Sequence, residues 1–429
     1  MKRYIFICIA LLLSFHNGLG QEQLTVFKGA TIHASSEVTF ENGVMLIEDG
    51  AIKDVGAVGD VRIPRKAEVV DLTGKVIMPG LVDAHSHIGE GDGGDRSSAL
   101  HPDVRILDAV DPKSDTFKKA LAGGITTANV MPGSGHLMSG RTVYLKLREA
   151  NTIDEMLFVD DIYNEVAGGL KMANGTNSIG SAPFPGTRAK SAAMVRELFV
   201  KAQEYQQKIE QADGDPEKMP PRDLGMETLI QVMEGERIVH NHTHRHDDIL
   251  TAIRLSKEFG YRLVLHHISE AWKIADEIAA SGVMASIIVL DSPGGKMEAV
   301  DIRYENGQEL EKAGVEVLGY HTDDPITDSR HFLRSAAFGI RAGMSEKAAF
   351  EAVTIDNARM MDLQDRLGTL EEGKDADFII MSGDPFSIYT KIEQTWVEGV
   401  KRFDITNPED KKYAVGGYEI FRGAFHDHH

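Results

Sequence analysis

Hydrophobic and polar residues alternate in short runs near both ends of the chain. Near the start such runs cover residues 24–27, 43–47 and 68–72, separated by turn residues, and the same pattern returns at residues 376–381 and 394–400. Alternation with a period of two is typical of strands with one buried face, and Asp-Gly breaks favour hairpins. We therefore expect a small β-sandwich domain that is composite, built from residues 21–76 and 369–405.

Between these segments, over residues 77–368, strand-like runs alternate with stretches of helical spacing. Gly260 and Gly282 follow the ends of two expected helices. The expected strands cover residues 76–78, 125–131, 238–242, 262–267, 283–290 and 315–320, and the expected helices cover residues 115–121, 191–211, 247–259 and 269–281. Roughly eight strand–helix units fit an α/β fold of the (β/α)8 TIM-barrel type. No Gly-x-Gly-x-x-Gly run follows an expected strand, which argues against a nucleotide-binding fold.

The first twenty residues have the layout of a secretory signal. Lys2 and Arg3 form a basic start, residues 4–15 are largely apolar, and a small-x-small sequence precedes Gln21. The apolar run is too short to span a bilayer comfortably, and the alternative is a buried N-terminal helix. We expect residues 1–20 to be a signal peptide, so that the mature protein is periplasmic or extracellular, with no membrane anchor.

Composition narrows the possible chemistry. The formal net charge is −20, which argues against binding to nucleic acid or anionic lipid. The single cysteine, Cys8, lies within the expected signal peptide, so the mature chain would have no disulfide, thiolate zinc site or cysteine nucleophile. Any metal would then have nitrogen and oxygen ligands. Residues 406–429, which end in a histidine-rich sequence from His426 to His429, are expected to form a C-terminal tail.

Two histidines follow the first expected barrel strand. Side chains alternate between the two faces of a strand, so His85 and His87 point the same way and Ser86 points the opposite way. At the C-terminal end of a barrel strand this direction is the barrel mouth, where TIM-barrel enzymes have their active sites. Two structural histidines would explain the pair equally well in isolation, but the strand before it and the glycine-rich loop after it favour a metal site.

Further histidines end two later strands. The histidines from His240 to His246 are spaced by two, and of those near the strand end His242 is the preferred ligand, followed by His244. His266 and His267 are adjacent, so we expect only one ring to point inward, and His267 lies nearer the strand end. Each histidine alone is more often structural, but three units that each end in histidine indicate a metal site.

A carboxylate follows the last expected barrel strand, in the sequence His321-Thr322-Asp323-Asp324-Pro325. Asp323 can bind a metal and accept the proton of metal-bound water, whose pKa falls toward about 7 on coordination. The same carboxylate can pass the proton to the leaving group. The alternative is that Asp323 or Asp324 caps the next helix.

Three segments resemble the amidohydrolase superfamily. Residues 79–87 closely resemble its first-strand signature, residues 122–127 also fit, and residues 368–378 look like the segment where its chain returns from the barrel to the β-sandwich. The similarity covers nearly the whole mature chain and is closest to the imidazolonepropionase-like branch.

The resemblance implies roles for the candidate residues. His85 and His87 correspond to metal ligands on the first strand, and His242 and His267 to ligands on the fifth and sixth strands. Asp323 corresponds to a ligand that also acts as the general base and acid.

Lys171 is the candidate for one further metal ligand that the resemblance implies. Members with two ions use a bridging carboxylated lysine, or a glutamate, on strand four. Relatives in this branch often have a glutamate near the position of Thr176, and this chain has no glutamate there. The number of divalent ions, one or two, therefore stays open. The implied ligands suit zinc, and also manganese, iron or nickel.

The resemblance implies a metal-dependent hydrolase in which a metal-activated hydroxide cleaves a C–N bond in an amide or cyclic amide of a small molecule. Arg188, Arg245 and the loop of residues 133–136 are candidate substrate contacts. Two alternatives remain: an exported, prolidase-like dipeptidase with the same fold, and a binding protein without turnover, against which the general base Asp323 argues. The sequence is also compatible with a homo-oligomer.

Overall fold

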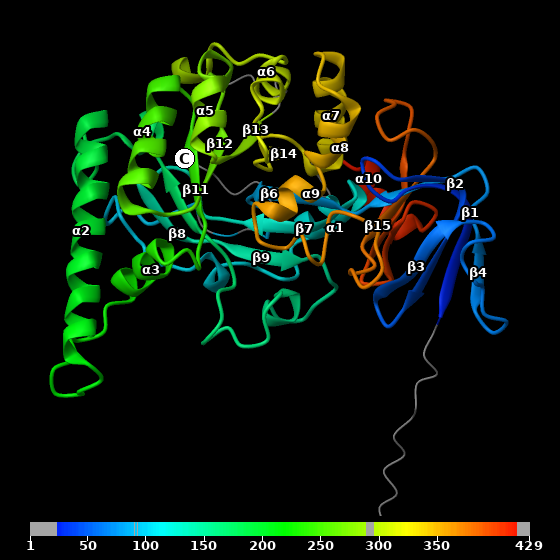
Figure 1. Ribbon diagram of the computed structural model, residues 1–429, viewed down its shortest axis with the longest axis horizontal. Helices are drawn as coiled ribbons and strands as arrows, with labels where there is room; N and C mark the ends of the chain where they lie inside the picture. Colours follow the sequence, from blue (N-terminus) through cyan, green and yellow to red (C-terminus); the bar gives the residue numbers. More distant parts are fainter. Residues whose placement is uncertain (1–23, 90, 92, 289–295, 418–429) are drawn as a thin grey trace, which may run out of the picture.

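The computed structural model of the chain describes residues 24–89, 91, 93–288 and 296–417. The expected signal peptide and the histidine-rich end therefore lie outside the described residues. Within these ranges a small β domain lies beside a larger α/β part (Figure 1). None of the helices in the described part of the chain is long and apolar enough to cross a membrane.

The β domain consists of one hydrogen-bonded sheet built from both ends of the chain. Its order is β17-β16-β15-β5-β1-β2-β3, and β4 pairs with β1 as a branch. The strands are β1 (Thr25–His33), β2 (Thr39–Glu48), β3 (Ala51–Ala57), β4 (Glu68–Asp71), β5 (Val76–Pro79), β15 (Phe378–Met381), β16 (Ile392–Val397) and β17 (Val400–Asp404). β5 pairs with both β1 and β15. The domain boundary expected after residue 76 therefore falls inside β5.

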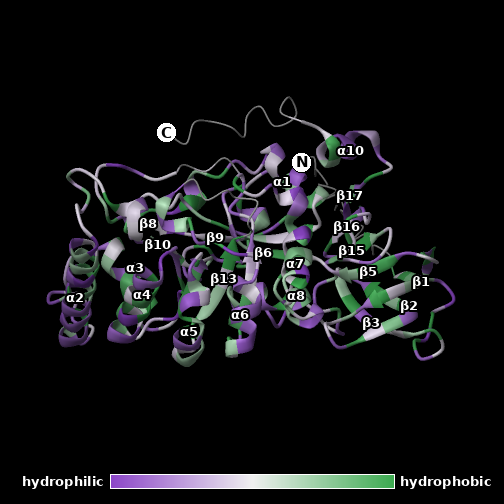
Figure 2. Cartoon of the chain, turned by 90° about the horizontal axis from the view of Figure 1, so that it is seen from above, coloured by the Kyte–Doolittle hydropathy of each residue, from purple (hydrophilic) through white to green (hydrophobic). Residues whose placement is uncertain are grey.

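This sheet curls so that strands far apart in its order face each other across one core. The ring of Phe27 on β1 lies 5.0 Å from the ring of Trp396 on β16, although the two strands are three positions apart in the sheet. A flat sheet would separate them by about 14 Å. Backbone bonds from Ile52 to Lys374 and from Ala376 to Gly50, both 2.8 Å, close the curl. Hydrophobic residues accordingly gather in these strands (Figure 2).

The strands of the α/β part form a barrel. A six-stranded sheet has the order β14-β13-β12-β11-β10-β8, and a three-stranded sheet has the order β6-β7-β9. The strands are β6 (Leu81–Ser86), β7 (Ile125–Val130), β8 (Met138–Arg141), β9 (Val143–Lys146), β10 (Leu170–Ala173), β11 (Val239–Thr243), β12 (Leu263–His267), β13 (Met284–Ile288) and β14 (Leu318–His321). At one junction Asp323 N donates to His85 O (2.9 Å), and at the other Thr142 N donates to Gly169 O (3.0 Å). The expected α/β class is confirmed.

The third barrel position departs from the expected series of strand–helix units. β8 and β9 follow each other across Thr142, and they pair antiparallel with β10 and β7, respectively. The reason is the short connection of residues 131–137, which turns the chain back after β7 with no crossover helix. A parallel neighbour needs a crossover of a dozen or more residues. The expectation of a strict (β/α)8 barrel is therefore wrong at this position.

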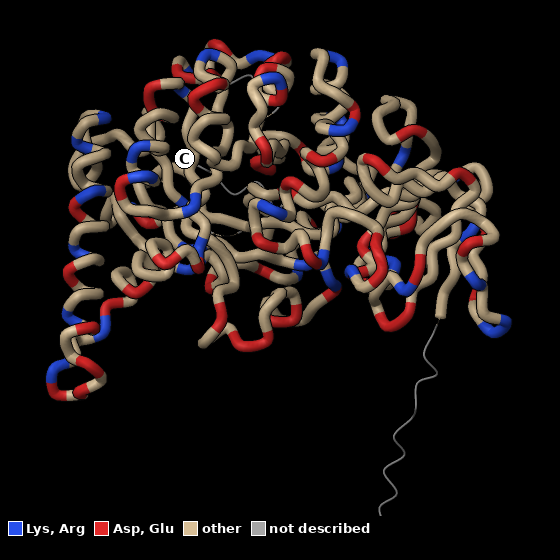
Figure 3. Tube along the Cα trace, viewed as in Figure 1, with Lys and Arg blue, Asp and Glu red and all other residues tan. Residues whose placement is uncertain are grey.

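Helices cover the outside of the barrel (Figure 1). They are α1 (Asp115–Ala122), α2 (Arg188–Ala212), α3 (Leu224–Met233), α4 (His246–Phe259), α5 (Ala275–Ser281), α6 (Asn306–Ala313), α7 (Phe332–Arg341), α8 (Glu346–Glu351) and α9 (Ile355–Arg359). Gly260 and Gly282 end α4 and α5 with φ of 76° and 70°, a left-handed conformation that glycine adopts without strain. Acidic and basic residues intermingle along the outer helix α2 (Figure 3).

The start of the expected C-terminal tail is a helix. Residues Pro408–Val415 form α10, which begins after the capping side chain of Asn407. The Tyr413 hydroxyl donates to Asp115 Oδ1 at 2.7 Å, which ties α10 to the start of α1. The chain therefore remains packed on the barrel beyond the last strand of the β domain.

One buried lysine connects the barrel with the β domain. Lys146 on β9 is fully buried, and its Nζ donates to Asp375 (2.6 Å) and Asp377 (2.9 Å), which precede β15. Lys146→Met would leave the buried Asp377 without this cation, and breaking a buried ion pair costs about 3–5 kcal/mol. We expect a loss of about this size in the free energy of unfolding, measured with urea. Lys208→Met, at an exposed site on α2, is the control, and equal stability of the two variants would contradict the prediction.

Candidate metal centre

The six candidate ligands lie together at one end of the barrel. His85 and His87 come from the end of β6, Lys171 from β10, His242 from β11, His267 from the last residue of β12, and Asp323 from the turn after β14. Parallel strands of a barrel end at the same rim, so residues far apart in the sequence meet there.

Asp323 is the centre of this group. Its Oδ1 lies 2.9 Å from His87 Nε2 and 3.1 Å from His85 Nε2, and its Oδ2 lies 4.0 Å from His267 Nδ1. The residue has a φ of 52°, a left-handed conformation that aspartate tolerates better than most residues. Burial alone would raise the pKa of Asp323, but the hydrogen bond from His87 and the charges of nearby groups hold it well below its usual range. Asp323 is therefore a carboxylate at neutral pH.

Lys171 is a buried amine beside these residues. Its Nζ lies 3.0 Å from His85 Nε2 and 3.1 Å from Met131 Sδ, and its side chain is fully buried. No carboxylate lies within 4.0 Å of this Nζ in the residues that the structure describes. Burial lowers the pKa of Lys171 to about 7. A large fraction of the amine is then neutral at physiological pH, the form that reacts with carbon dioxide.

His242, His244 and His267 form a second group of imidazoles. Their ligand atoms all lie within 4.8 Å of one another. Both ring nitrogens of His242 and the Nε2 of His267 are buried and have no hydrogen-bond partner among the described residues. Buried polar atoms are nearly always satisfied, so these nitrogens fit a bound cation. Burial also lowers the pKa of each ring, to about 3 for His244, which keeps the imidazoles neutral and able to coordinate.

The expectation that only one of His266 and His267 faces inward is wrong. The His85 ring centroid lies 4.7 Å from that of His266 and 4.9 Å from that of His267. The reason is the φ of 70° at His267, which breaks the alternation of side chains along β12 and turns both rings toward the barrel interior.

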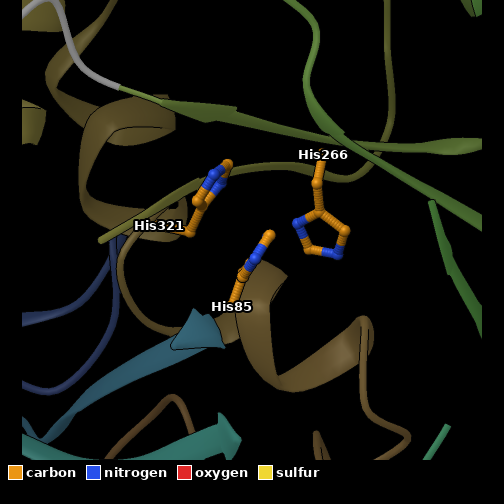
Figure 4. A group of neighbouring side chains, drawn as sticks. All are labelled: His85, His266 and His321. Carbon is orange, nitrogen blue, oxygen red and sulfur yellow. The ribbon is translucent and has the colours of Figure 1, made fainter. Parts of the chain in front are cut away.

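A third group, His85, His266 and His321, lies deeper in the barrel. The three side chains come from β6, β12 and β14 and converge in the space between the strands (Figure 4), with their ligand atoms within 4.8 Å of one another. His266 and His321 each have a further hydrogen-bond partner. His266 Nε2 lies 2.9 Å from His240 Nδ1, and His321 Nδ1 lies 2.8 Å from Ser286 Oγ. These hydrogen bonds hold the rings of His266 and His321 in place beside His85.

The spacing of residues in the sequence also carries a signal for His321, which is not among the expected ligands. His321 precedes Asp323 by two positions, as His85 precedes His87, so the same alternation predicts that its side chain points inward.

Asp83 carries a similar signal, two residues before His85. It is buried, with a pKa that burial raises to about 7, and it accepts hydrogen bonds from Thr322 Oγ1 (2.5 Å) and His85 N (3.2 Å). Asp83 thereby holds β6 against the end of β14.

The residues present fit one or two divalent cations. The set His85, His87 and Asp323 has its ligand atoms within 4.8 Å of one another, as does the set of three imidazoles around His242. Imidazole nitrogen and carboxylate oxygen are the donors that zinc and similar ions prefer. Lys171 lies beside the first set, in contact with His85.

Comparison with known proteins identifies the family. The sequence profile described as the Amidohydrolase family matches residues 76–408. The chain belongs to the amidohydrolase family. An amidohydrolase from Thermotoga maritima is 33% identical, has a TM-score of 0.82 and is covered completely by 89% of this chain. Together with the relatives' names, the family membership makes the protein a hydrolase that acts on carbon–nitrogen bonds.

The names of more distant relatives refer to different activities. Amidohydrolase tasK of Hapsidospora irregularis is 26% identical over 396 residues, which are 84% of this chain but only 40% of that protein. The imidazolonepropionase of Fusobacterium nucleatum is 22% identical over 80% of this chain and 86% of its own length. A solved prolidase in complex with N-methylphosphonate-L-proline is 16% identical with a TM-score of 0.55, which shows a shared fold.

Proposed function

We propose that the protein is a zinc-dependent amidohydrolase that cleaves a C–N bond in a small amide or cyclic amide. The observation that carries the proposal is the position of Asp323, a buried carboxylate within 3.1 Å of two histidines at the end of the barrel. The family generally uses a divalent metal, and export through residues 1–20 is part of the same proposal.

Each candidate ligand has a place in this centre. His85, His87 and Asp323 would hold one ion, and His242 and His267 a second. Carbon dioxide would add to the neutral amine of Lys171 with loss of one proton, and the carbamate so formed would be a further ligand for a divalent ion. A bound divalent ion supplies Lewis-acid chemistry, polarising the substrate carbonyl and lowering the pKa of water.

Asp323 would move the proton that hydrolysis requires. Its Oδ1 faces His85 and His87, whereas no hydrogen bond from the described residues reaches Oδ2. Oδ2 can therefore accept the proton from the attacking water and donate it to the nitrogen of the leaving group. The buried imidazoles, held neutral by burial, do not compete for that proton.

Removal of the metal tests the proposal. We expect purified protein to contain one or two zinc ions per chain and to hydrolyse at least one compound from a panel of lactams, imidazolones, N-acyl amino acids and dipeptides. Dialysis against a chelator should abolish this activity, and added zinc should restore it, because only the bound ion lowers the pKa of water toward about 7. Protein without stoichiometric metal, or full activity after chelation, would overturn the proposal.

The same panel separates the second candidate, an exported dipeptidase. Hydrolysis confined to dipeptides would favour it, and hydrolysis of lactams or imidazolones would favour the cyclic-amide enzyme. Normal metal loading without turnover on any member of the panel would indicate a binding protein.

A further inference from the structure

A lysine that the proposed chemistry does not use reaches the metal centre from the segment after β13. Lys296 Nζ donates to Asn177 Oδ1 at 2.7 Å and lies 3.5 Å from Nε2 of His244, a member of the second imidazole group. The residue as a whole is exposed, whereas its ammonium group turns toward the site. Withdrawal from water lowers the pKa of Lys296, and the negative charges of Glu298 and Asp323 oppose this shift.

The position of Lys296 is fixed by its neighbour two residues on. Glu298 is buried, and its Oε2 accepts a hydrogen bond from Thr176 N at 2.8 Å and lies 3.5 Å from Arg188 Nη2. The segment after β13 is thus attached to the segment after β10 at two points, through Glu298 and through Lys296 itself. This attachment presents the ammonium group beside the imidazoles.

Other cations in this region already have carboxylate partners. Arg188 pairs with Asp248 at 2.9 Å and Arg245 with Asp247 at 2.9 Å, so these two candidate substrate contacts are engaged within the protein. The partners of Lys296 are an amide oxygen and an imidazole, both uncharged, and no carboxylate lies within 4.0 Å of its Nζ in the described ranges. Its positive charge therefore remains available to a ligand.

We propose that Lys296 binds a carboxylate of the substrate, which rests on the proposed hydrolase function and narrows its substrate class. An ammonium–carboxylate hydrogen bond is among the stronger contacts available to a small ligand. The His244 ring lies 4.7 Å from the His242 ring, so a carboxylate at Lys296 would lie near a carbonyl held at the metal centre. N-acyl amino acids and short peptides with a free α-carboxylate carry these two groups close together.

A matched pair of substrates tests this assignment. The pair is an N-acyl-L-amino acid and its primary carboxamide, which differ only in the carboxylate. We expect wild-type protein to prefer the acid. Lys296→Met should reduce kcat/KM for the acid about tenfold or more, mainly through KM, and should change the value for the carboxamide less than twofold. Lys296→Arg should retain the preference, since it keeps the charge.

The control variant is Lys312→Met on α6, where the lysine pairs with Glu309 away from the site. It should leave both substrates unchanged. An equal effect of Lys296→Met on acid and carboxamide, or a loss of bound zinc in that variant, would overturn the assignment of Lys296 as a carboxylate contact.

Calorimetric binding of the same two compounds to zinc-loaded protein separates this inference from the proposed function. Preferential binding of the acid that disappears in Lys296→Met, without hydrolysis of any compound, would support the carboxylate site and overturn the hydrolase. Hydrolysis of both compounds at equal rates, unchanged in Lys296→Met, would overturn the carboxylate site and leave the hydrolase in place.

Discussion

Asp323→Asn is expected to reduce kcat by about 10³-fold, the size of effect that loss of a general acid–base group produces. Asparagine keeps the shape of the side chain and can still accept the hydrogen bond that His87 makes to Oδ1. It cannot accept the proton from water at Oδ2 or carry the negative charge that a cation requires. Steady-state kinetics on the best substrate of the panel, with metal content measured in parallel, would show the effect.

The matched control for this variant is Asp362→Asn. Asp362 forms an exposed ion pair with Arg262 at 2.6 Å, and exposed pairs contribute about 0–1 kcal/mol to stability. We expect this variant to retain full activity. If Asp323→Asn kept more than a tenth of wild-type kcat, Asp323 would not be the proton carrier.

Lys171→Met is expected to remove the second metal ion and to lower kcat/KM by about 100-fold or more, beyond the effect typical of residues that only support metal ligands. Methionine fills nearly the same buried volume but cannot form a carbamate. The fold should survive, because the native amine is held in an environment that lowers its pKa to about 7 and so disfavours its charge. If the wild type binds two ions per chain, the metal content of the variant should fall to one.

Two further measurements sharpen this experiment. Carbon-13 NMR of protein prepared with labelled bicarbonate should show a carbamate signal in the wild type and none in Lys171→Met. Lys171→Glu replaces the amine with a carboxylate and should recover part of the lost metal. Two ions retained by Lys171→Met would show that the histidines and Asp323 bind both without a bridge.

Much of the centre could be predicted because it depends on short-range geometry. His85 and His87 are two positions apart on one strand, so their shared direction follows from the period of the strand alone. The histidines of β11 follow from the same rule. The inward turn of both His266 and His267 could not be predicted, because it depends on a left-handed residue that has no glycine or asparagine to mark it.

Other features depend on contacts between distant segments. The antiparallel third strand follows from the short connection before Met138, and the pattern of hydrophobic residues does not encode strand direction. Lys296 resembles any surface lysine in the sequence. Its place beside His244 arises from the buried Glu298, which binds a segment more than a hundred residues earlier in the chain.

The composite β domain has a consequence for the order in which the molecule can form. β5 must pair with β15, so that Pro79 meets Phe378, and nearly the whole barrel sequence lies between them. During synthesis β5 therefore emerges long before its partner β15, and the chain cannot complete this sheet until β15, β16 and β17 have been made. Such long-range pairing folds slowly because the entropy of closing a long loop is lost first.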